Sequence, residues 1–300
     1  MSASMPDLTV PIGSVTLRNP VIPASGTFAA SYGRVYDLGR LGGLVPKTLM
    51  PGYRPGHPPN RLTETGGGLL NAVGIPSDGV EAFLDETLPA YKGWGTPLIV
   101  SISADTAAGF AELVRTLEGQ GVDAIELNLS CPNLEEGGRS FALDTAMTAE
   151  VVAACRDTAL PLWAKLSPNA EDVAAIASAA VEAGADALIV ANTLTGIAFR
   201  RDGRPALANV TGGLSGTPLK PVNLRCTYQV AQALPKVPVI GCGGIATLQD
   251  ALDYMAAGAS AVAVGSATFT RPLAMIHLID AIATHCTTKG IAARDLTRRA

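Results

Sequence analysis

Two short patterns alternate along the chain, and their repetition limits the folds that it can adopt. One pattern reads Gly121-Val-Asp-Ala-Ile, Gly184-Ala-Asp-Ala-Leu and Gly258-Ala-Ser-Ala-Val, and the other begins at Pro97, Pro161 and Pro238. Each pattern recurs after roughly 65 to 75 residues, and segments with helical periodicity lie between them. Short apolar strands that alternate with amphipathic helices predict parallel β/α units.

The strand candidates predict a closed, eight-stranded (β/α)8 TIM barrel, built as a single domain from residues 1–300. The candidates are 21–24, 43–46, 97–102, 124–129, 161–166, 187–192, 237–241 and 261–265, and residues 8–17 predict an additional N-terminal β-hairpin. The 300 residues suit such a barrel, which typically has about 250 residues plus insertions. A doubly wound sheet is the alternative, but the lack of a second domain favours closure.

Three helices can be placed from their apolar spacing. Phe110, Leu113, Val114 and Leu117 share one face of the first. The second is expected to begin with Asn169 as its N-cap and to end at Gly184. Thr247 opens the third.

Composition excludes several classes of function. The net charge is −4, and the adjacent basic pairs are Arg200-Arg201 and Arg298-Arg299, which argues against nucleic acid as the main partner. No apolar run reaches the roughly 20 residues that span a membrane. The first eleven residues have neither a basic start nor an apolar stretch, so we expect no signal peptide and a cytoplasmic protein.

The cysteines have no spacing that is typical of a metal or iron–sulfur site. There are five of them, an odd number that argues against a disulfide framework in a chain without a signal peptide. If the protein passes electrons through a cluster, we expect that cluster on another chain. No histidine, serine or carboxylate pattern predicts a metal site or a Ser-His-Asp triad.

Polar residues gather where the predicted strands end. The connections that leave strands two, four and six are long (48–77, 130–145 and 193–218), and barrel active sites are built from such loops. The strand ends carry Ser25, Lys47, Thr48, Ser101, Asn128, Cys131, Lys165, Asn192 and Thr193.

Cys131 is the main catalytic candidate. It follows strand four directly, and the polar, glycine-containing loop 133–139 after it is typical of a lid. A thiol in this place suits a base or a nucleophile. The alternative, a small buried residue, is the interpretation that we keep for Cys155, Cys226, Cys242 and Cys286.

Two lysines are candidates for charge stabilisation. Lys165 ends strand five, where an unpaired buried ammonium would be costly, so it is expected to form a Schiff base or to stabilise an anion. Lys47 has the same two interpretations, and a solvated loop lysine is its alternative.

Glycine turns after strands seven and eight predict a phosphate site at Gly243, Gly244, Gly265 and Ser266. Residues 241–246 also fit G-x-G-x-x-A formally. We reject a dinucleotide fingerprint because the motif is at strand seven and no acidic residue closes the next strand.

Taken together, the longer motifs resemble class 1 dihydroorotate dehydrogenases, and specifically the FMN-binding catalytic subunit of class 1B. The resemblance runs from about Leu8 to the last helix. Its motifs are Pro23-Ala-Ser-Gly-Thr-Phe28, Leu70-Asn-Ala-Val-Gly-Ile75, Ile125-Glu-Leu-Asn-Leu-Ser-Cys-Pro-Asn133, Lys165-Leu-Ser-Pro-Asn169, Asn192-Thr-Leu-Thr-Gly196 and Leu207-Ala-Asn-Val-Thr-Gly-Gly-Leu-Ser-Gly216. Cys131 and the stretch 208–216 favour class 1B over the membrane-bound class, which uses serine.

The resemblance implies a role for each site residue. Cys131 is the base that takes a proton from C5 of dihydroorotate, while hydride leaves C6 for FMN, and Lys165 stabilises the charge of the reduced flavin. The implied substrate-binding residues are Lys47, Asn71, Ala72, Val73, Gly74, Ile75, Asn128, Asn133, Asn192 and Thr193. The implied FMN-binding residues are Ser25, Lys47, Thr48, Ser101, Asn128, Lys165, Ala191, Gly216, Gly243, Gly244, Gly265 and Ser266. Ser101 departs from the pattern, since asparagine is common there, so that contact is expected to be weaker or water-mediated.

The resemblance also implies a partner. Class 1B members work in de novo pyrimidine (UMP) biosynthesis with a subunit that carries FAD and a 2Fe–2S cluster and delivers electrons to NAD, as a heterotetramer with two copies of each chain. The alternatives are a fumarate-dependent class 1A enzyme, a dihydropyrimidine-reducing enzyme, a Schiff-base aldolase that uses Lys165, and a non-catalytic barrel that binds a phosphorylated ligand.

Overall fold

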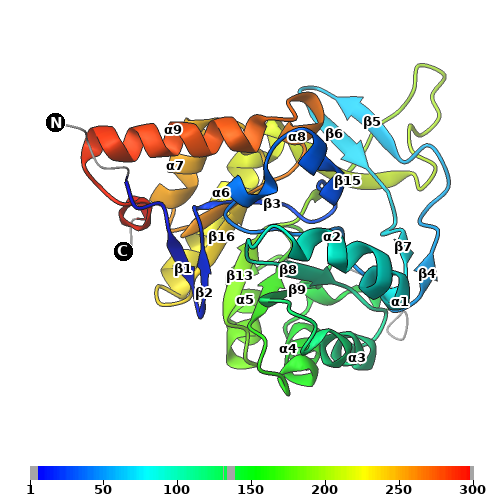
Figure 1. Cartoon of the computed structure of the whole chain (residues 1–300). Helices are drawn as coiled ribbons and strands as arrows, with labels where there is room; N and C mark the ends of the chain where they lie inside the picture. The colour runs from blue at the N-terminus through cyan, green and yellow to red at the C-terminus, as the bar shows by residue number, and fades with distance from the viewer. Residues whose placement is uncertain (1–5, 131, 134–138, 298–300) are drawn as a thin grey trace.

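A curled parallel sheet forms the centre of the molecule, with helices on its outside (Figure 1). The computed structural model describes residues 6–130, 132–133 and 139–297. The sheet has seven strands in the order β3-β17-β16-β13-β12-β9-β8. Their bounds are β3 Val21–Pro23, β8 Ile99–Ile102, β9 Ala124–Asn128, β12 Leu162–Lys165, β13 Ala187–Val190, β16 Val239–Cys242 and β17 Ala261–Val264. Every residue of these strands is buried, as expected for parallel strands that are covered on both faces.

The prediction of a closed eight-stranded barrel is wrong for the second strand. Residues 43–46 form no strand, and only isolated parallel bridges, Leu44 with Leu98 and Leu49 with Ile102, join this segment to β8. The segment still lies between β3 and β8, since Gly42 N–H donates to Val21 O (2.9 Å) and Leu44 N–H to Pro97 O (2.7 Å). Pro46 has no N–H to donate, and this interrupts the ladder. The fold is therefore TIM-barrel-like, and at one position of the sheet isolated bridges replace a continuous strand.

Helices follow most of the strands. The longer ones are α3 Ala107–Leu117, α4 Thr145–Cys155, α5 Val173–Glu182, α6 Lys220–Ala233, α7 Leu248–Ala256 and α9 Ala274–Lys289. The shorter helical segments are α1 Val80–Ala82, α2 Leu88–Lys92, α8 Ala267–Thr270, the π-helical η3 Phe83–Thr87, and the 3-10 turns η1 Ala30–Arg34, η2 Leu38–Arg40, η4 Phe141–Leu143, η5 Thr217–Leu219 and η6 Ala293–Leu296.

The helix signals in the sequence were confirmed in two cases and displaced in one. The predicted face of α3 is buried, and Thr247 caps α7 in a capping box with Asp250. The N-cap of α5 is Asp172, whose carboxylate accepts from Ala174 N and Ala175 N, and not Asn169. The Asn169 amide instead donates to Thr193 O (3.0 Å), and thus connects two strand-end loops.

The long loops fold into small antiparallel sheets of their own. β5 Leu62–Thr65, β6 Gly68–Asn71, β14 Leu194–Ile197 and β15 Thr211–Gly216 form a four-stranded sheet in the order β14-β15-β6-β5. Two-stranded sheets pair β4 Tyr53–Arg54 with β7 Ser77–Asp78, β10 Pro132–Asn133 with β11 Arg139–Ser140, and β1 Val10–Ile12 with β2 Val15–Leu17. The last pair confirms the predicted N-terminal hairpin.

The four-stranded sheet and the N-terminal hairpin lie on opposite sides of the molecule. In Figure 1 the arm that carries β5, β6 and β15 projects at one end, whereas β1 and β2 lie toward the other. One cluster of buried residues extends from Val10 to Ala293, and a small second cluster of Leu70, Ala72 and Leu207 lies beneath the arm. None of the described helices is long and apolar enough to cross a membrane.

Candidate active site

A cavity of about 920 Å³ opens where the strands of the central sheet end. It is lined by residues from the ends of β3, β9, β12, β13, β16 and β17 and by the four-stranded sheet of the arm. This volume is at the upper end of the range for small-molecule sites, roughly 300 to 1,000 Å³. The cavity can therefore hold a cofactor-sized molecule together with a small substrate.

A lysine and a carboxylate form a buried ion pair at the base of the cavity. Lys165 Nζ lies 3.5 Å from Glu126 Oε1, and the two side chains are 5% and 2% exposed. Ser25 Oγ connects them, because it accepts from Lys165 Nζ (2.8 Å) and donates to Glu126 Oε1 (2.6 Å). Lys165 thus has both a counter-charge and a hydrogen bond, which a buried ammonium requires.

Two asparagines and two hydroxyls form a second polar group on the cavity wall. Asn192 Nδ2 donates to Ser130 Oγ (2.9 Å) and to Asn128 Oδ1 (3.4 Å). Asn128 Nδ2 in turn donates to Thr48 Oγ1 (3.4 Å). These amides lie at the ends of β9 and β13, the two strands that flank β12 in the sheet, and together they offer donors and acceptors to a planar polar ligand.

Lys47 lines the cavity without a carboxylate partner among the described residues. Burial lowers the pKa of its ammonium below 10.5. A half-buried cation that faces a cavity in this way favours binding of an anion there.

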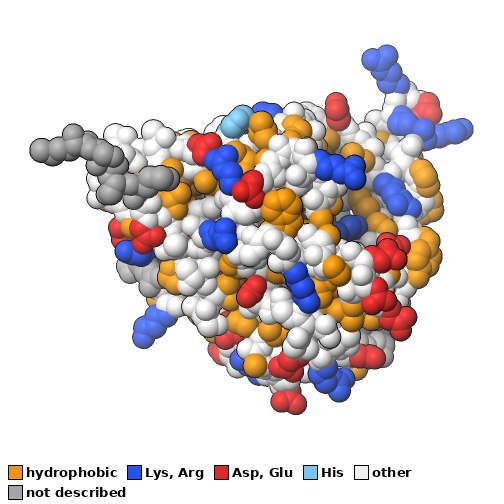
Figure 2. All heavy atoms as spheres, in the orientation of Figure 1, with side chains coloured by type: hydrophobic (Ala, Val, Ile, Leu, Met, Phe, Trp, Pro, Cys, Tyr) orange, Lys and Arg blue, Asp and Glu red, His pale blue; other side chains and the backbone are white. Residues whose placement is uncertain are grey.

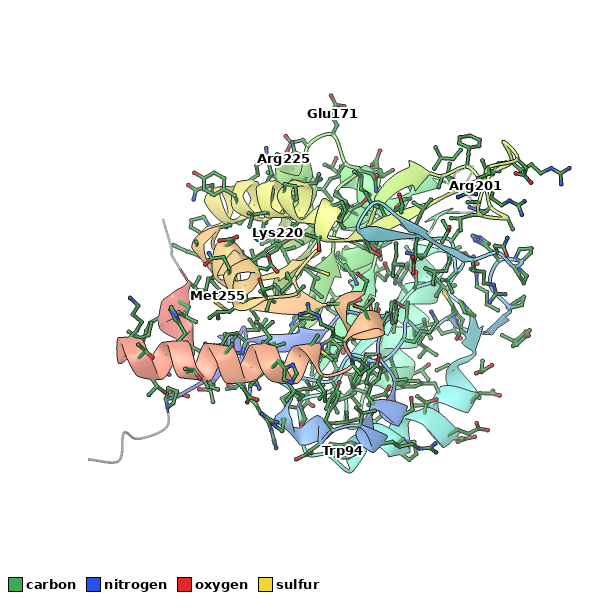
Figure 3. All side chains as sticks on the ribbon, turned by 90° about the horizontal axis from the view of Figure 1, so that it is seen from above. Trp94, Glu171, Arg201, Lys220, Arg225 and Met255 are labelled. Carbon is green, nitrogen blue, oxygen red and sulfur yellow. The ribbon has the colours of Figure 1, made fainter. Side chains whose placement is uncertain are left out.

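The turn after β16 directs backbone N–H groups away from the rest of the chain. The N–H groups of Gly243, Gly244 and Ile245 make no hydrogen bond to the described residues, and all three residues line the cavity. Gly243 and Gly244 have φ of +124° and +68°. Lys220 is labelled at the start of α6 in Figure 3. Its Nζ donates to Asp250 and Asp253 at 2.6 Å each, and this connects the start of α6 to α7.

Most of the predicted site residues meet in this one cavity. Those that line it are Ser25, Lys47, Thr48, Asn71, Val73, Gly74, Ile75, Asn128, Lys165, Ala191, Asn192, Thr193, Gly216, Gly243, Gly244, Gly265 and Ser266. Ala72 and Ser101 do not line it. Ala72 belongs to the small cluster beneath the arm, and Ser101 is fully buried behind Thr48. Cys131 and the Asn133 side chain lie outside the described residues.

Three residues at the site were not predicted from the sequence. Glu126 is the only carboxylate in the otherwise largely apolar strand β9. A charged residue in a buried strand was the sequence signal that could have identified it. Asn223 is fully buried on α6, and its amide donates to the carbonyls of Ala191, Asn192 and Cys242. The sequence around Asn223 is typical of an exposed helix and did not indicate this buried role. Arg271 lines the cavity and donates to Ala246 O (2.9 Å).

Comparison with known proteins identifies the family. The family model for dihydroorotate dehydrogenase matches residues 7–285. The chain belongs to the dihydroorotate dehydrogenase family. Relatives described as "Dihydroorotate dehydrogenase B (NAD(+)), catalytic subunit" include one from Geotalea uraniireducens, 46% identical over 96% of this chain and 95% of the relative. Another, from Pelobacter propionicus, is 49% identical over 90% of both chains, and one from Desulforudis audaxviator is 46% identical over 94% and 93%.

The cavity of this dihydroorotate dehydrogenase family member suits a flavin that carries a phosphate group. A methyl group on Gly244 would lie 2.7 Å from Lys220 Cβ and 2.8 Å from Lys220 N, so the turn can pack this closely against the start of α6 only with glycine at this position. The free N–H groups of this turn suit phosphate oxygens. Figure 2 shows positive and negative side chains interspersed over one face of the molecule, with no large basic patch there to compete for an anion.

Proposed function

We propose that this chain is the FMN-binding catalytic subunit of a class 1B dihydroorotate dehydrogenase, which oxidises (S)-dihydroorotate to orotate in the cytoplasm during de novo pyrimidine biosynthesis. The observation that carries the proposal is the family match over residues 7–285. The single cavity that gathers the predicted strand-end residues supports it. We also propose that residues 1–300 act as one domain.

The reaction removes one proton and one hydride from the substrate. Cys131 is the base that takes the proton from C5. Bound FMN would supply the acceptor for the hydride that leaves C6. Lys165 holds its positive charge at the cavity wall, where negative charge develops, and its pairing with Glu126 and Ser25 supports this role over a Schiff base.

The remaining residues hold the two ligands. Lys47, Asn71, Asn128, Asn192 and Thr193 bind the substrate, with Asn133 and residues 73–75 beside them, because an ammonium and several amides complement a carboxylate and an imide. Ser25, Thr48, Ala191 and Gly216 line the FMN site. The phosphate of FMN binds at Gly243, Gly244, Gly265 and Ser266. The N–H groups in the turn after β16, which make no hydrogen bond to the described residues, support this assignment.

Electrons leave through a partner. The relatives are named catalytic subunits of an NAD(+)-linked enzyme, and this supports a second subunit that carries FAD and a 2Fe–2S cluster. The four described cysteines are buried on separate elements, and no group of them among the described residues could bind a metal. We propose a heterotetramer with two copies of each chain.

The absorption spectrum of the purified chain tests the proposal. We expect a bound flavin whose absorption bleaches when dihydroorotate is added without oxygen. NADH should form only after the partner subunit is added. A colourless protein, or a flavin that dihydroorotate leaves oxidised, would contradict the proposed reaction. Turnover of fumarate by the isolated chain would instead support class 1A.

A further inference from the structure

We propose that Glu126 is a positioning residue for the reaction, because it is the common acceptor of two hydrogen-bond chains that begin at the cavity wall. One chain orients the amide of Asn128, and the other holds the ammonium of Lys165. This inference rests on the proposed function of the site, and it concerns a residue that does not line the cavity.

Glu126 lies in the middle of β9 and is 2% exposed. Its Oε1 accepts from Ser25 Oγ (2.6 Å) and from Ser101 Oγ (2.7 Å), and lies 3.5 Å from Lys165 Nζ. An ionised carboxylate can accept hydrogen bonds but cannot donate them. Both serine hydroxyls must therefore point their protons at Glu126, and this fixes the direction of every bond further out.

The first chain runs from Glu126 to the asparagines. The single proton of Ser101 points at Glu126, so in its 2.9 Å contact with Thr48 the Ser101 oxygen accepts. Thr48 has then used its proton, and its oxygen can only accept from Asn128 Nδ2 (3.4 Å). With its NH₂ group turned to Thr48, Asn128 presents Oδ1 to Asn192 Nδ2 (3.4 Å).

The second chain is shorter. Lys165 Nζ donates to Ser25 Oγ (2.8 Å), and Ser25 passes its own proton toward Glu126. Ser25 therefore presents only a lone pair to other partners in the cavity. The negative charge of Glu126 at 3.5 Å also offsets part of the field that Lys165 exerts on the cavity.

Two substitutions separate the chains. Glu126→Gln keeps the shape but removes the charge and adds a donor, so neither chain keeps a fixed direction. Ser101→Ala breaks only the chain to Asn128, and Ser101 is fully buried and does not line the cavity. Asp123→Asn is a matched control, because Asp123 precedes the same strand at its other end and accepts from Leu98 N (2.8 Å).

The experiment measures orotate affinity and flavin midpoint potential in the FMN-loaded chain. Orotate titrations should show binding about tenfold weaker in both Ser101→Ala and Glu126→Gln, the effect of one misdirected hydrogen bond in a dry site. Glu126→Gln should also raise the midpoint potential, because Lys165 then stabilises added negative charge without compensation. If the substitution favours the reduced over the oxidised flavin tenfold, the two-electron midpoint potential rises by about 30 mV. Asp123→Asn should match the unchanged chain in both orotate affinity and midpoint potential. Ser101→Ala should match it in midpoint potential only.

Each outcome decides the inference. Unchanged orotate affinity in Ser101→Ala overturns it, and this variant alone decides if Glu126→Gln does not fold. An unchanged potential in folded Glu126→Gln overturns the role toward Lys165. In both cases the unchanged chain is still bleached by dihydroorotate, and the proposed function stands. If the unchanged chain holds flavin but is not bleached, the proposed function fails, and the inference fails with it.

Discussion

At the scale of single residues, Cys131 carries the proton transfer that we propose. Serine keeps the size of the side chain, but its hydroxyl is a far weaker acid than a thiol and a poorer base at neutral pH. Cys131→Ser should retain bound flavin, and dihydroorotate should reduce it about 10² to 10⁴ times more slowly, the usual contribution of a positioned base. Anaerobic stopped-flow measurement of flavin bleaching checks this. A single-turnover rate equal to that of the unchanged chain would refute the assigned role.

The positive charge of Lys47 is proposed to bind the substrate, and this can be tested by substitution. Replacement by methionine should weaken orotate binding about ten- to hundredfold, the effect of one charge-assisted hydrogen bond. The matched control is Lys92→Met, a lysine of α2 that does not line the cavity. An orotate affinity in Lys47→Met equal to that of this control would remove Lys47 from the substrate site.

The same lysine predicts an effect of pH on stability. Burial lowers the pKa of Lys47 in the folded chain below its unfolded value of 10.5. Between the two values the unfolded chain binds more protons, so Lys47 makes the free energy of unfolding rise with pH across that window. Urea denaturation of Lys47→Met at several alkaline pH values should show that this contribution is absent. Parallel curves for both proteins would contradict it.

The residues of the site differ in how far the sequence reveals them. Lys165 and Asn128 could be placed because each ends an apolar strand, and the ends of parallel strands meet at one edge. Glu126 could not, since its role depends on Ser25 and Ser101, which lie 101 and 25 residues away along the chain. Ser101 was expected at the flavin, but the pleat of β8 turns it into the wall behind Thr48.

At the scale of elements, the glycine turn after β16 is the part of the proposed phosphate site that should tolerate substitution least. Gly244→Ala puts a methyl group at φ +68°, against the Lys220 backbone. We expect FMN affinity to fall at least tenfold and stability by about 1 to 3 kcal/mol. Gly203→Ala is the control, with φ +79° but nothing within 4 Å of the added methyl group. Fluorescence titration with FMN and urea denaturation measure both. Equal FMN affinity in the two variants would argue against a phosphate at this turn.

Elements were predictable where one local signal dominates. Buried apolar runs such as Ala261–Val264 have no competing interpretation once their repeat is recognised. The segment 43–46 has the apolar content of a strand, but Pro46 removes a donor, and its pairing depends on β3 and β8 on either side. The four-stranded arm was also missed, because its strands come from two loops that are more than a hundred residues apart.

At the scale of the whole molecule, the cavity reaches the buried core at the end of β16. The four described cysteines are buried, and burial raises the pKa of each thiol, that of Cys155 to about 12. A thiol reacts as its thiolate, so all four should resist alkylation in the folded, FMN-loaded chain at neutral pH. Of the four, only Cys242 lines the cavity, where a bound FMN would cover it.

Alkylation with iodoacetamide, followed by peptide mapping, tests this arrangement. In the FMN-loaded chain we expect Cys155, Cys226, Cys242 and Cys286 to stay unlabelled for hours and to react within minutes in urea. Removal of FMN should increase labelling of Cys242 several-fold. Cys155 and Cys286 are internal controls, because they lie on α4 and α9 and would become labelled together with it only if the chain unfolded. Equal labelling of Cys242 with and without FMN would place the flavin elsewhere, since Cys242 lines the cavity that we propose for FMN.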